Sequence, residues 1–312
     1  MSRVFVIGGG ASGMLAAIAA ARNGHKVELF EKNEKLGKKL YITGKGRCNL
    51  TNACDRDTFF RQVVSNPKFL YTAFYQFNSQ DTMDFFEQLG LPLKVERGNR
   101  VFPVSDRSSD VIGALKRELE NQKVTVHYHS EVNGILTENG QFRGLSIKDD
   151  PKERMADAVI IATGGLSYPS TGSTGDGYAF AKAMGHTVTS LHPSLVPVHV
   201  REAYVKELMG LSLRNIEIRI TAGKKQIYRD FGELLFTHFG VSGPVILSAS
   251  SYIIPWLSKK EELLLSIDLK PALTPEQLDA RILRDFEEYK NRCYKNSLDQ
   301  LLPNKLIDVI IR

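Results

Sequence analysis

The stretch Arg3-Val-Phe-Val-Ile-Gly-Gly-Gly-Ala-Ser-Gly13 decides the fold, because a short apolar run ends there in three glycines. Arg3–Ile7 is rich in β-branched and apolar residues, which predicts a buried parallel strand. An alanine-rich helix is expected from about Ala11 to Asn23. Lys26–Phe30 is the second expected strand, and Glu31 stands at its end. The order of strand, helix and strand predicts a βαβ unit.

The turn between the first strand and the helix carries Gly8-x-Gly10-x-x-Gly13. Gly8 allows a tight turn, Gly10 lets the backbone approach a pyrophosphate, and Gly13 lets helix and strand pack closely. The start of the helix then offers free N–H groups to the phosphates. Glu31 lies 31 − 13 = 18 residues beyond the last glycine, where it can accept hydrogen bonds from a ribose. The pattern predicts an adenine dinucleotide site, against the alternative of a glycine-rich turn without a ligand.

These residues leave the choice of dinucleotide open. Glu31 argues against a 2′-phosphate on the ribose, although the neighbouring Lys32 has the opposite charge. A pyridine-nucleotide disulfide reductase would need one glycine loop for each of its two cofactors, and no second such loop follows a strand. A single motif near the N-terminus fits either FAD or NAD.

Composition and charge narrow the class of protein. The chain has 312 residues, 42% hydrophobic and 24% charged, which is ordinary for a globular protein of about two domains. Three cysteines cannot form a disulfide framework. The net charge of +6, from 41 basic and 35 acidic side chains, is too small to predict nucleic acid binding. The densest basic cluster runs from Lys32 to Arg47.

The sequence predicts a cytoplasmic protein. The best apolar stretch, Gly243–Leu257, is too short to span a membrane and contains two prolines. Ser2-Arg3 leads straight into a strand pattern, so no signal peptide is expected. Free cysteines agree with a reducing compartment. Cys48 and Cys54 are separated by five residues, which is not the spacing of a redox dithiol.

Longer motifs add a family resemblance. Gly37-Lys-Lys-Leu-Tyr-Ile-Thr-Gly-Lys-Gly-Arg-Cys-Asn-Leu-Thr-Asn52 resembles the signature of the BaiN/YhiN-type flavoproteins. Further segments resemble other motifs of that family: Arg100–Asp106, Ala162–Gly165 with Gly172–Gly177, and Gly232–Pro244. The similarity covers essentially the whole chain. It implies that the dinucleotide is FAD and that the protein is an FAD-dependent oxidoreductase.

The resemblance extends the expected cofactor site beyond the glycine loop. It implies that Lys38, Lys39 and Arg47 face the pyrophosphate, that Cys48 and Asn49 lie near the isoalloxazine ring, and that Val132 meets the adenine. Together with the glycine loop, the expected cofactor-binding residues are Gly8, Gly10, Ala11, Ser12, Gly13, Glu31, Lys32, Lys38, Lys39, Gly46, Arg47, Cys48, Asn49, Val132, Ala162, Thr163 and Gly164. No metal site is expected.

The catalytic residues are not fixed by the sequence. Tyr168, just after a double-glycine turn, and His238, in the motif at 232–244, are candidates by location. Each has a structural alternative, Tyr168 as a loop anchor and His238 as an ordinary hydrogen-bonded imidazole.

Three hypotheses on function stay open. The first, implied by the resemblance, is hydride transfer between the flavin and a small organic substrate, with NAD(P)H or O2 as redox partner. The second is a flavin-dependent tRNA-modifying or RNA-binding protein, which would need a basic surface with exposed aromatic residues. The modest net charge argues against nucleic acid. The third is an inactive fragment, because the family's final flavin-contacting segment has no counterpart here and the chain looks shortened at its C-terminus.

The expected fold class is α/β, with a Rossmann-like FAD-binding domain, an inserted β-barrel-like domain and a small helical domain. Their expected ranges are 1–190, 191–272 and 273–312. Helices are expected from Gln62 to Gly90 and from Arg107 to Gln122, and strands at 124–128, 131–137 and 142–147 are expected to form a meander. Core candidates in the first helical stretch are Phe69, Phe74, Phe77, Phe85, Phe86 and Leu89.

Overall fold

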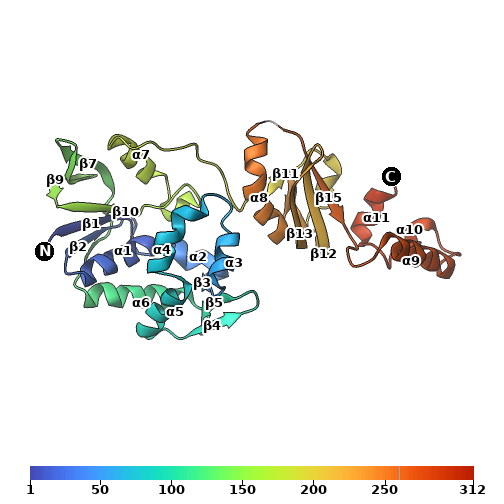
Figure 1. Ribbon diagram of the computed structural model, residues 1–312, viewed down its shortest axis with the longest axis horizontal. Coiled ribbons are helices and arrows are strands. Elements are labelled where there is room, and N and C mark those ends of the chain that lie inside the picture. The colour runs from blue at the N-terminus through green and yellow to red at the C-terminus, as the bar shows by residue number, and fades with distance from the viewer. Residues whose placement is uncertain (260) are drawn as a thin grey trace. The chain divides into compact units, whose positions relative to one another are not determined.

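The computed structural model describes residues 1–259 and 261–312. The chain divides into two compact units, Met1–Thr189 and Ser190–Arg312 (Figure 1). Among the described residues, none of the helices combines the length and the apolar character that crossing a membrane requires. The α/β class with a Rossmann-like domain, a β-barrel-like domain and a helical part is confirmed.

A four-stranded parallel sheet organises the first unit. Its strands are β1 (Arg3–Ile7), β2 (Lys26–Phe30), β6 (Thr125–His127) and β10 (Ala158–Ile161), in the order β10-β1-β2-β6. Helix α1 (Ala11–Arg22) connects β1 to β2, so the predicted βαβ unit is confirmed. Strand β1 lies between β2 and β10, so the strand order reverses at β1. Open α/β sheets bind ligands at the carboxyl ends of the strands where the order reverses.

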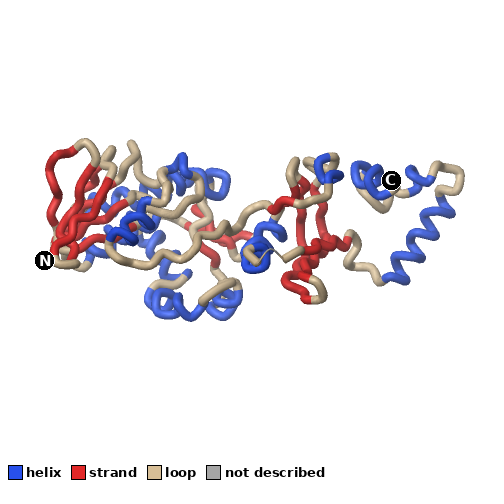
Figure 2. Tube along the Cα trace, turned by 90° about the horizontal axis from the view of Figure 1, so that it is seen from above, coloured by secondary structure: helices blue, strands red, loops and turns tan. Residues whose placement is uncertain are grey.

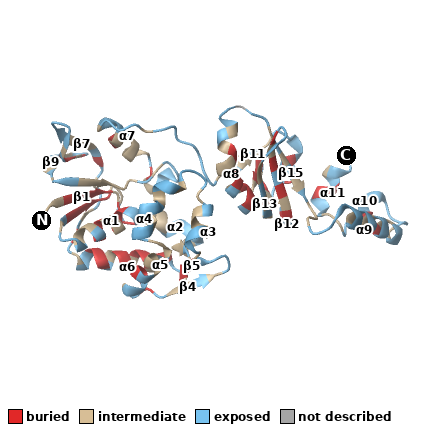
Figure 3. Cartoon of the chain, in the orientation of Figure 1, coloured by how far each residue is buried: buried red, intermediate tan, exposed pale blue. Residues whose placement is uncertain are grey.

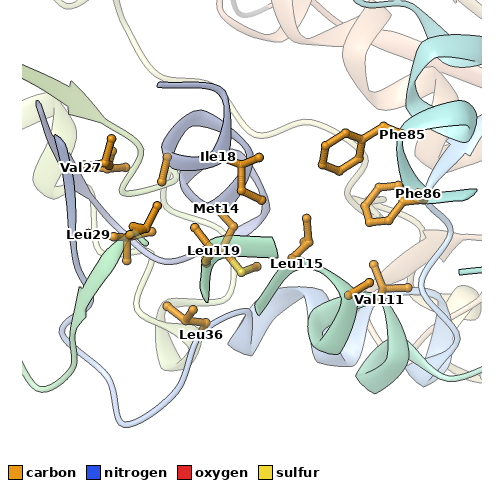
Figure 4. Close-up of a cluster of buried hydrophobic side chains, with 14 of the residues drawn as sticks. Met14, Ile18, Val27, Leu29, Leu36, Phe85, Phe86, Val111, Leu115 and Leu119 are labelled. Atoms are coloured by element: carbon orange, nitrogen blue, oxygen red, sulfur yellow. The ribbon is translucent and has the colours of Figure 1, made fainter. Parts of the chain in front are cut away.

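The side chains of alternate residues of β1 pack into two different hydrophobic cores. Val4 and Val6 pack with α1 and with α6 (Ser108–Asn121). Phe5 and Ile7 belong to a second buried cluster on the other face. Figure 4 shows the first core, in which Met14 and Ile18 of α1 meet Leu115 and Leu119 of α6. A parallel strand buried on both faces explains the continuous apolar sequence of residues 4–7.

An antiparallel meander covers the other face of the sheet. It consists of β7 (Val132–Glu138), β8 (Gln141–Ile147) and β9 (Asp150–Met155), and the nearby helix α7 (Asp176–Ala183) adds Phe180 to the same core. The predicted meander was wrong in one strand, since residues 125–127 form β6 of the parallel sheet. The sequence reasoning missed β9 because its residues are mostly charged and lack an alternating pattern.

The segment between the signature motif and α6 is only partly buried. It contains three helices and a 3-10 turn, α3 (Arg56–Arg61), η2 (Pro67–Leu70), α4 (Tyr71–Gln76) and α5 (Ser79–Gln88). Phe85 and Phe86 of α5 are buried as predicted, whereas Phe69 is 85% exposed and Phe77 is 46% exposed. The prediction that Phe69 and Phe77 lie in the core was wrong. The helical stretch is interrupted before Pro67 and at Asn78, which separates η2 and α4 from α5, the helix that packs into the core.

The signature motif itself forms short elements around a small sheet. These are α2 (Lys38–Ile42), η1 (Thr43–Gly46), β3 (Thr51–Asn52), β4 (Leu93–Glu96) and β5 (Arg100–Pro103), with the strands in the order β3-β5-β4. The polypeptide passes through left-handed backbone at Gly44, Lys45 and Cys48. This tight path holds the motif beside the carboxyl end of the parallel sheet.

A five-stranded antiparallel sheet organises the second unit. Its strands, in the order β11-β14-β13-β12-β15, are β11 (Val198–His199), β14 (Gly240–Ser242), β13 (Lys225–Phe236), β12 (Ser212–Ala222) and β15 (Leu263–Asp268). Helix α8 (Pro244–Leu257) packs on β13. Figure 3 shows that buried residues concentrate in these strands and α8. Residues 225–229 and 233–236 both belong to the single strand β13.

Helices follow the sheet to the end of the chain, as predicted. They are α9 (Pro275–Glu288), α10 (Tyr294–Ser297) and α11 (Asn304–Ile310), seen in blue at the C-terminal end in Figure 2. Helix α9 begins with a capping box, in which the Thr274 hydroxyl accepts from the Gln277 N–H at 3.2 Å and the Gln277 side chain accepts from the Thr274 N–H at 2.9 Å.

A buried carboxylate ties three strands of the parallel sheet together. Glu28 on β2 is 5% exposed, and its carboxylate contacts Arg3 of β1 at 2.6 Å and His127 of β6 at 2.9 Å. Burial alone would raise the pKa of Glu28, but the hydrogen bonds from His127 and Arg3 outweigh burial and leave that pKa below its ordinary value of 4.5.

The Glu28→Gln variant is therefore expected to be less stable than the wild type at neutral pH, by about 1–2 kcal/mol. A lowered pKa in the folded state means that the carboxylate stabilises the fold above about pH 4.5 and that this contribution is lost as the pH falls further. Thermal melts of both proteins at neutral pH and at about pH 3 test this. A difference in melting temperature that stays the same at both pH values would contradict the role of the charge.

Candidate functional site

A cavity of about 470 Å³ opens at the carboxyl ends of β1, β2 and β10, beside the first turn of α1. This is the place where the strand order of the sheet reverses, and the volume lies in the range of small-molecule sites, roughly 300–1,000 Å³. The segments 7–12, 30–33 and 162–164 form one part of its wall, and the signature segment contributes another.

A glycine is favoured at each of these three positions for a different geometric reason. A Cβ atom on Gly8, whose φ is +103°, would lie 2.5 Å from the carbonyl oxygen of Ala162. A Cβ atom on Gly13 would lie 1.8 Å from the carbonyl oxygen of Gly8. A Cβ atom on Gly10 would meet no protein atom within 4 Å. Gly8 and Gly13 are thus needed for packing, while Gly10 leaves open space for a ligand to approach the backbone.

The first turn of α1 is suited to bind a diphosphate. Gly10 is the N-cap residue, it provides no side-chain cap, and no acidic residue lies in the first turn. The N–H groups at a helix start have no partner within the helix, and they carry the positive end of its dipole. Ala11 and Ser12, which line the cavity, therefore present free donors where phosphate oxygens would lie.

Glu31 fixes the glycine loop and lines the cavity at the end of β2. One carboxylate oxygen accepts the N–H of Gly9 at 2.7 Å, and the other accepts the backbone and side-chain N–H groups of Asn33 at 2.8 and 2.6 Å. A carboxylate offers about four acceptor positions. These three bonds hold the loop in place and leave acceptor capacity, so binding of a ribose by Glu31 stays a prediction.

Three lysines of the basic cluster lie at the cavity wall. Lys32 contacts Asp176 at 2.6 Å, and Lys39 donates to the Ser173 hydroxyl at 2.6 Å. Lys38 donates to the Asn33 side chain at 3.1 Å. The first two contacts connect the segment after β2 to residues 171–176, which also line the cavity.

Arg47 has a different partner from the one expected. Its guanidinium pairs with Glu96 and Asp106 and lies 4.1 Å from the ring centre of Phe102. Lys94 contacts Asp106 as well, at 2.6 Å. The hydrogen bonds that the guanidinium donates to Glu96 and Asp106 raise the pKa of Arg47. Its charge is therefore already matched within the protein, and Arg47 does not form part of the cavity wall.

Cys48 and Asn49 lie at the cavity wall within the signature segment. Burial raises the pKa of the Cys48 thiol, so the sulfur is held in its neutral form. With its amide rotated so that the nitrogen faces the carbonyl oxygens of Thr51 and Val101, Asn49 would donate to both, at 3.0 and 3.1 Å. These two bonds would fix the Asn49 side chain and leave its amide oxygen as an acceptor.

The structure brings most of the expected cofactor-binding residues to one cavity. Those that line it are Gly8, Gly10, Ala11, Ser12, Glu31, Lys32, Lys38, Lys39, Cys48, Asn49, Val132, Ala162, Thr163 and Gly164. Gly13, Gly46 and Arg47 are not in the wall. Gly13 acts by packing, and Gly46 and Arg47 belong to the turn that leads toward the carboxylates of Glu96 and Asp106.

The sequence reasoning missed several residues of the wall. Asn33 could have been predicted, because it lies two positions after Glu31. Ser173 could have been predicted as well, because it lies within the motif Gly172–Gly177. Thr43 likewise lies within the signature segment. Other missed residues are apolar or come from helices distant in sequence, among them Leu15, Leu40, Leu50, Thr82, Phe86 and Leu115.

Neither of the two catalytic candidates, Tyr168 and His238, lines this cavity. Tyr168 is 66% exposed, has a φ of +54°, and its carbonyl accepts from Thr171. His238 lies in the turn between β13 and β14 of the second unit, where its ring meets Phe239 edge-on at 4.8 Å. In the described ranges, no three His, Cys, Asp or Glu side chains are grouped as a metal site would require. Catalytic roles for Tyr168 and His238 stay predictions.

The fold and the cavity together define a dinucleotide-binding protein of the Rossmann type. Residues 2–250 match the family model described as the HI0933-like protein Rossmann domain. Residues 192–312 match the model described as the HI0933-like protein barrel and H2TH domain. The chain belongs to the HI0933-like family, which confirms the BaiN/YhiN-type resemblance.

Three curated relatives match nearly the whole chain. A 3-dehydro-bile acid delta(4,6)-reductase of Clostridium scindens is 34% identical over 98% of this chain and 74% of its own length. Two ribosomal RNA dihydrouridine synthases are 31% and 29% identical, that of Escherichia coli over 97% of this chain and 72% of its length, and that of Haemophilus influenzae over 99% and 74%. The chain thus spans about three quarters of each relative's length.

The family assigns the cofactor and the class of reaction. The dinucleotide is FAD, and the protein is an oxidoreductase. The cavity fits this group, because it offers free helix-start donors, open space above Gly10 and an acidic residue at the end of β2.

Proposed function

We propose that the protein uses FAD to reduce a carbon–carbon double bond conjugated to a carbonyl group. The observation that carries the proposal is the reaction shared by the named relatives. A delta(4,6)-reductase of a 3-dehydro bile acid acts on double bonds conjugated to a 3-oxo group, and a dihydrouridine synthase reduces the 5,6 double bond next to a uracil carbonyl. The identities of 29–34% over nearly the whole chain support the transfer of this chemistry.

The residues of the cavity would bind and orient the cofactor. FAD supplies hydride-transfer chemistry when bound. The N–H groups of Ala11 and Ser12 would hold its diphosphate, and Glu31 would accept from its ribose. Lys38 and Lys39 add positive charge at the wall.

The signature segment would contact the flavin ring. Asn49 would offer its amide oxygen to the ring, and the neutral Cys48 thiol would pack beside it. The apolar residues Leu40, Leu50 and Phe86 of the same cavity would exclude water from this end. Exclusion of water strengthens the polar contacts that orient a substrate.

We further propose that the electrons come from NAD(P)H and that the substrate is a small organic enone. The location proposed from the three unpaired cysteines is the cytoplasm, where thiols stay reduced. An RNA uridine is a second candidate substrate, favoured by the names of two relatives.

Anaerobic flavin spectroscopy tests the proposal. The purified chain is loaded with FAD, and NADH or NADPH is expected to bleach the flavin absorbance. A steroid with a 4-en-3-one group is then expected to restore the absorbance with stoichiometric loss of the double bond. A protein that takes up no FAD, or whose reduced flavin is reoxidised by O2 but by no enone, would contradict the proposed reaction.

A further inference from the structure

Arg47 precedes Cys48 and Asn49, two residues of the cavity wall, although its own side chain is not part of that wall. Its guanidinium is bound elsewhere. The Nε atom donates to Asp106 at 2.8 Å, and a terminal nitrogen donates to Glu96. Glu96 ends β4 and Asp106 follows β5, so the arginine joins the signature segment to the small sheet (Figure 1). The proposed reaction gives these charges no role.

The turn at 43–49 has a backbone conformation that residues other than glycine rarely adopt. Lys45 and Cys48 have φ values of +59° and +61°, and Gly44 is left-handed as well. A Cβ atom on Gly44 would lie 3.1 Å from the backbone nitrogen of Asn49, so the chain folds back closely on itself. Left-handed backbone at a lysine or a cysteine persists only where surrounding contacts enforce it.

Burial and backbone hydrogen bonds supply only part of that restraint. Residues 41–45 are exposed, whereas Cys48 is 4% exposed and packs into the first core. Within the turn, the Arg47 N–H donates to the Gly44 carbonyl at 3.2 Å, and the Cys48 N–H donates to the Thr43 carbonyl at 3.1 Å. The side chain of Arg47 adds a second anchor to the one that Cys48 makes in the core.

This anchor differs from an isolated surface ion pair. The guanidinium contacts two carboxylates at once and lies 4.1 Å from the ring centre of Phe102, which is 3% exposed. Lys94 contacts Asp106 at 2.6 Å and Glu96 at 3.6 Å, so the two carboxylates are themselves held in place. Isolated exposed ion pairs contribute little to stability, but several charges joined in a network contribute more.

We infer that Arg47 is a positioning residue, whose contacts with the two carboxylates hold the left-handed turn so that Cys48 and Asn49 face the flavin. The inference rests on the proposed function for the identity of the group at that wall. Because Arg47 lies outside the wall, its replacement acts on the cofactor only through its neighbours in the turn.

Labelling of the apoprotein with iodoacetamide, followed peptide by peptide in a mass spectrometer, tests the inference without FAD. In the wild type, the buried Cys48 is expected to react slowly and the exposed Cys293 quickly. Arg47→Met keeps an unbranched stem and removes the charge. It is expected to speed the labelling of Cys48 at least about tenfold and to leave that of Cys293 unchanged. The double variant Glu96→Gln, Asp106→Asn leaves the turn's own sequence intact and is expected to act in the same direction.

The matched control is Arg154→Met on β9. The Arg154 side chain is 36% exposed, close to the 33% of Arg47, and it contacts Asp150 at 2.9 Å. Arg154 does not line the cavity, so this variant is expected to leave Cys48 labelling unchanged. In a titration with FAD, Arg47→Met is expected to bind at least about fivefold more weakly than the wild type, because Asn49 loses its place. Arg154→Met is expected to bind FAD as the wild type does.

Three results would overturn the inference: unchanged labelling of Cys48 in Arg47→Met, an equal rise in Arg154→Met, or normal FAD affinity of Arg47→Met. If Arg47→Met does not fold, the double variant carries the same comparisons. The outcome is separate from that of the proposed reaction, since neither measurement uses a reductant or an enone. A wild type that binds FAD and reduces no enone refutes the reaction alone, whereas a failed labelling test refutes the positioning role alone.

Discussion

Replacing Gly10 with valine is expected to abolish FAD binding and to leave the folded apoprotein intact. The φ and ψ of Gly10, −77° and −174°, lie in the extended region that valine adopts readily. A Cβ atom there meets no protein atom within 4 Å, so the fold has room for the new side chain. The branched side chain would instead occupy the space above the first turn of α1, where the diphosphate is expected. Loss of its backbone contacts is expected to lower FAD affinity at least about 100-fold.

Equilibrium titration with FAD and a thermal melt of the apoprotein check this result together. The control is Gly113→Ala on α6, whose added Cβ would lie 3.4 Å from the flexible end of Arg117. That variant is expected to bind FAD as the wild type does. Normal FAD affinity in the Gly10→Val protein would show that the cofactor diphosphate lies elsewhere.

The Gly13→Ala variant is expected to have the opposite effect, a loss of stability before any ligand is added. Its Cβ would stand 1.8 Å from the Gly8 carbonyl oxygen, and a backbone oxygen held between β1 and α1 cannot move aside as a side chain can. Overpacking of this kind costs about 3 kcal/mol or more. For a unit of this size, the melting temperature is expected to fall by roughly 6–12 °C.

Thermal melts of the wild-type and Gly13→Ala apoproteins test this, because without FAD the melting temperatures do not depend on cofactor binding. Gly113→Ala again serves as control, and it is expected to be neutral or to stabilise α6 by up to about 1 kcal/mol. An unchanged melting temperature for Gly13→Ala would mean that α1 can move away from β1. The tight packing inferred for this turn would then be wrong.

The sequence was most informative where short-range patterns determine the structure. The apolar run at 4–7, the spaced glycines and the position of Glu31 predicted both the βαβ unit and the place of the cavity. Each of these depends on neighbours within a few turns of chain. Backbone geometry at such sites leaves few alternatives, and therefore the residue type is a reliable guide.

Long-range pairing could not be foreseen in the same way. Arg47 looked like a phosphate ligand because its partners, Glu96 and Asp106, lie 49 and 59 positions away. Strand β6 looked like part of a meander, since three strands in a row usually pair with one another, yet β6 pairs with β2. Exposed Phe69 looked like a core residue because hydrophobicity alone does not show which helices reach the core.

Strand β1 has no face that tolerates water, because its odd and even positions serve separate hydrophobic clusters. A polar replacement anywhere from Val4 to Ile7 would destabilise one cluster or the other. A shift of the strand by a single residue would exchange the bulky phenylalanine and isoleucine with the smaller valines in both clusters. A strand of only five residues is therefore hard to replace, and the glycines that follow it owe their position to it.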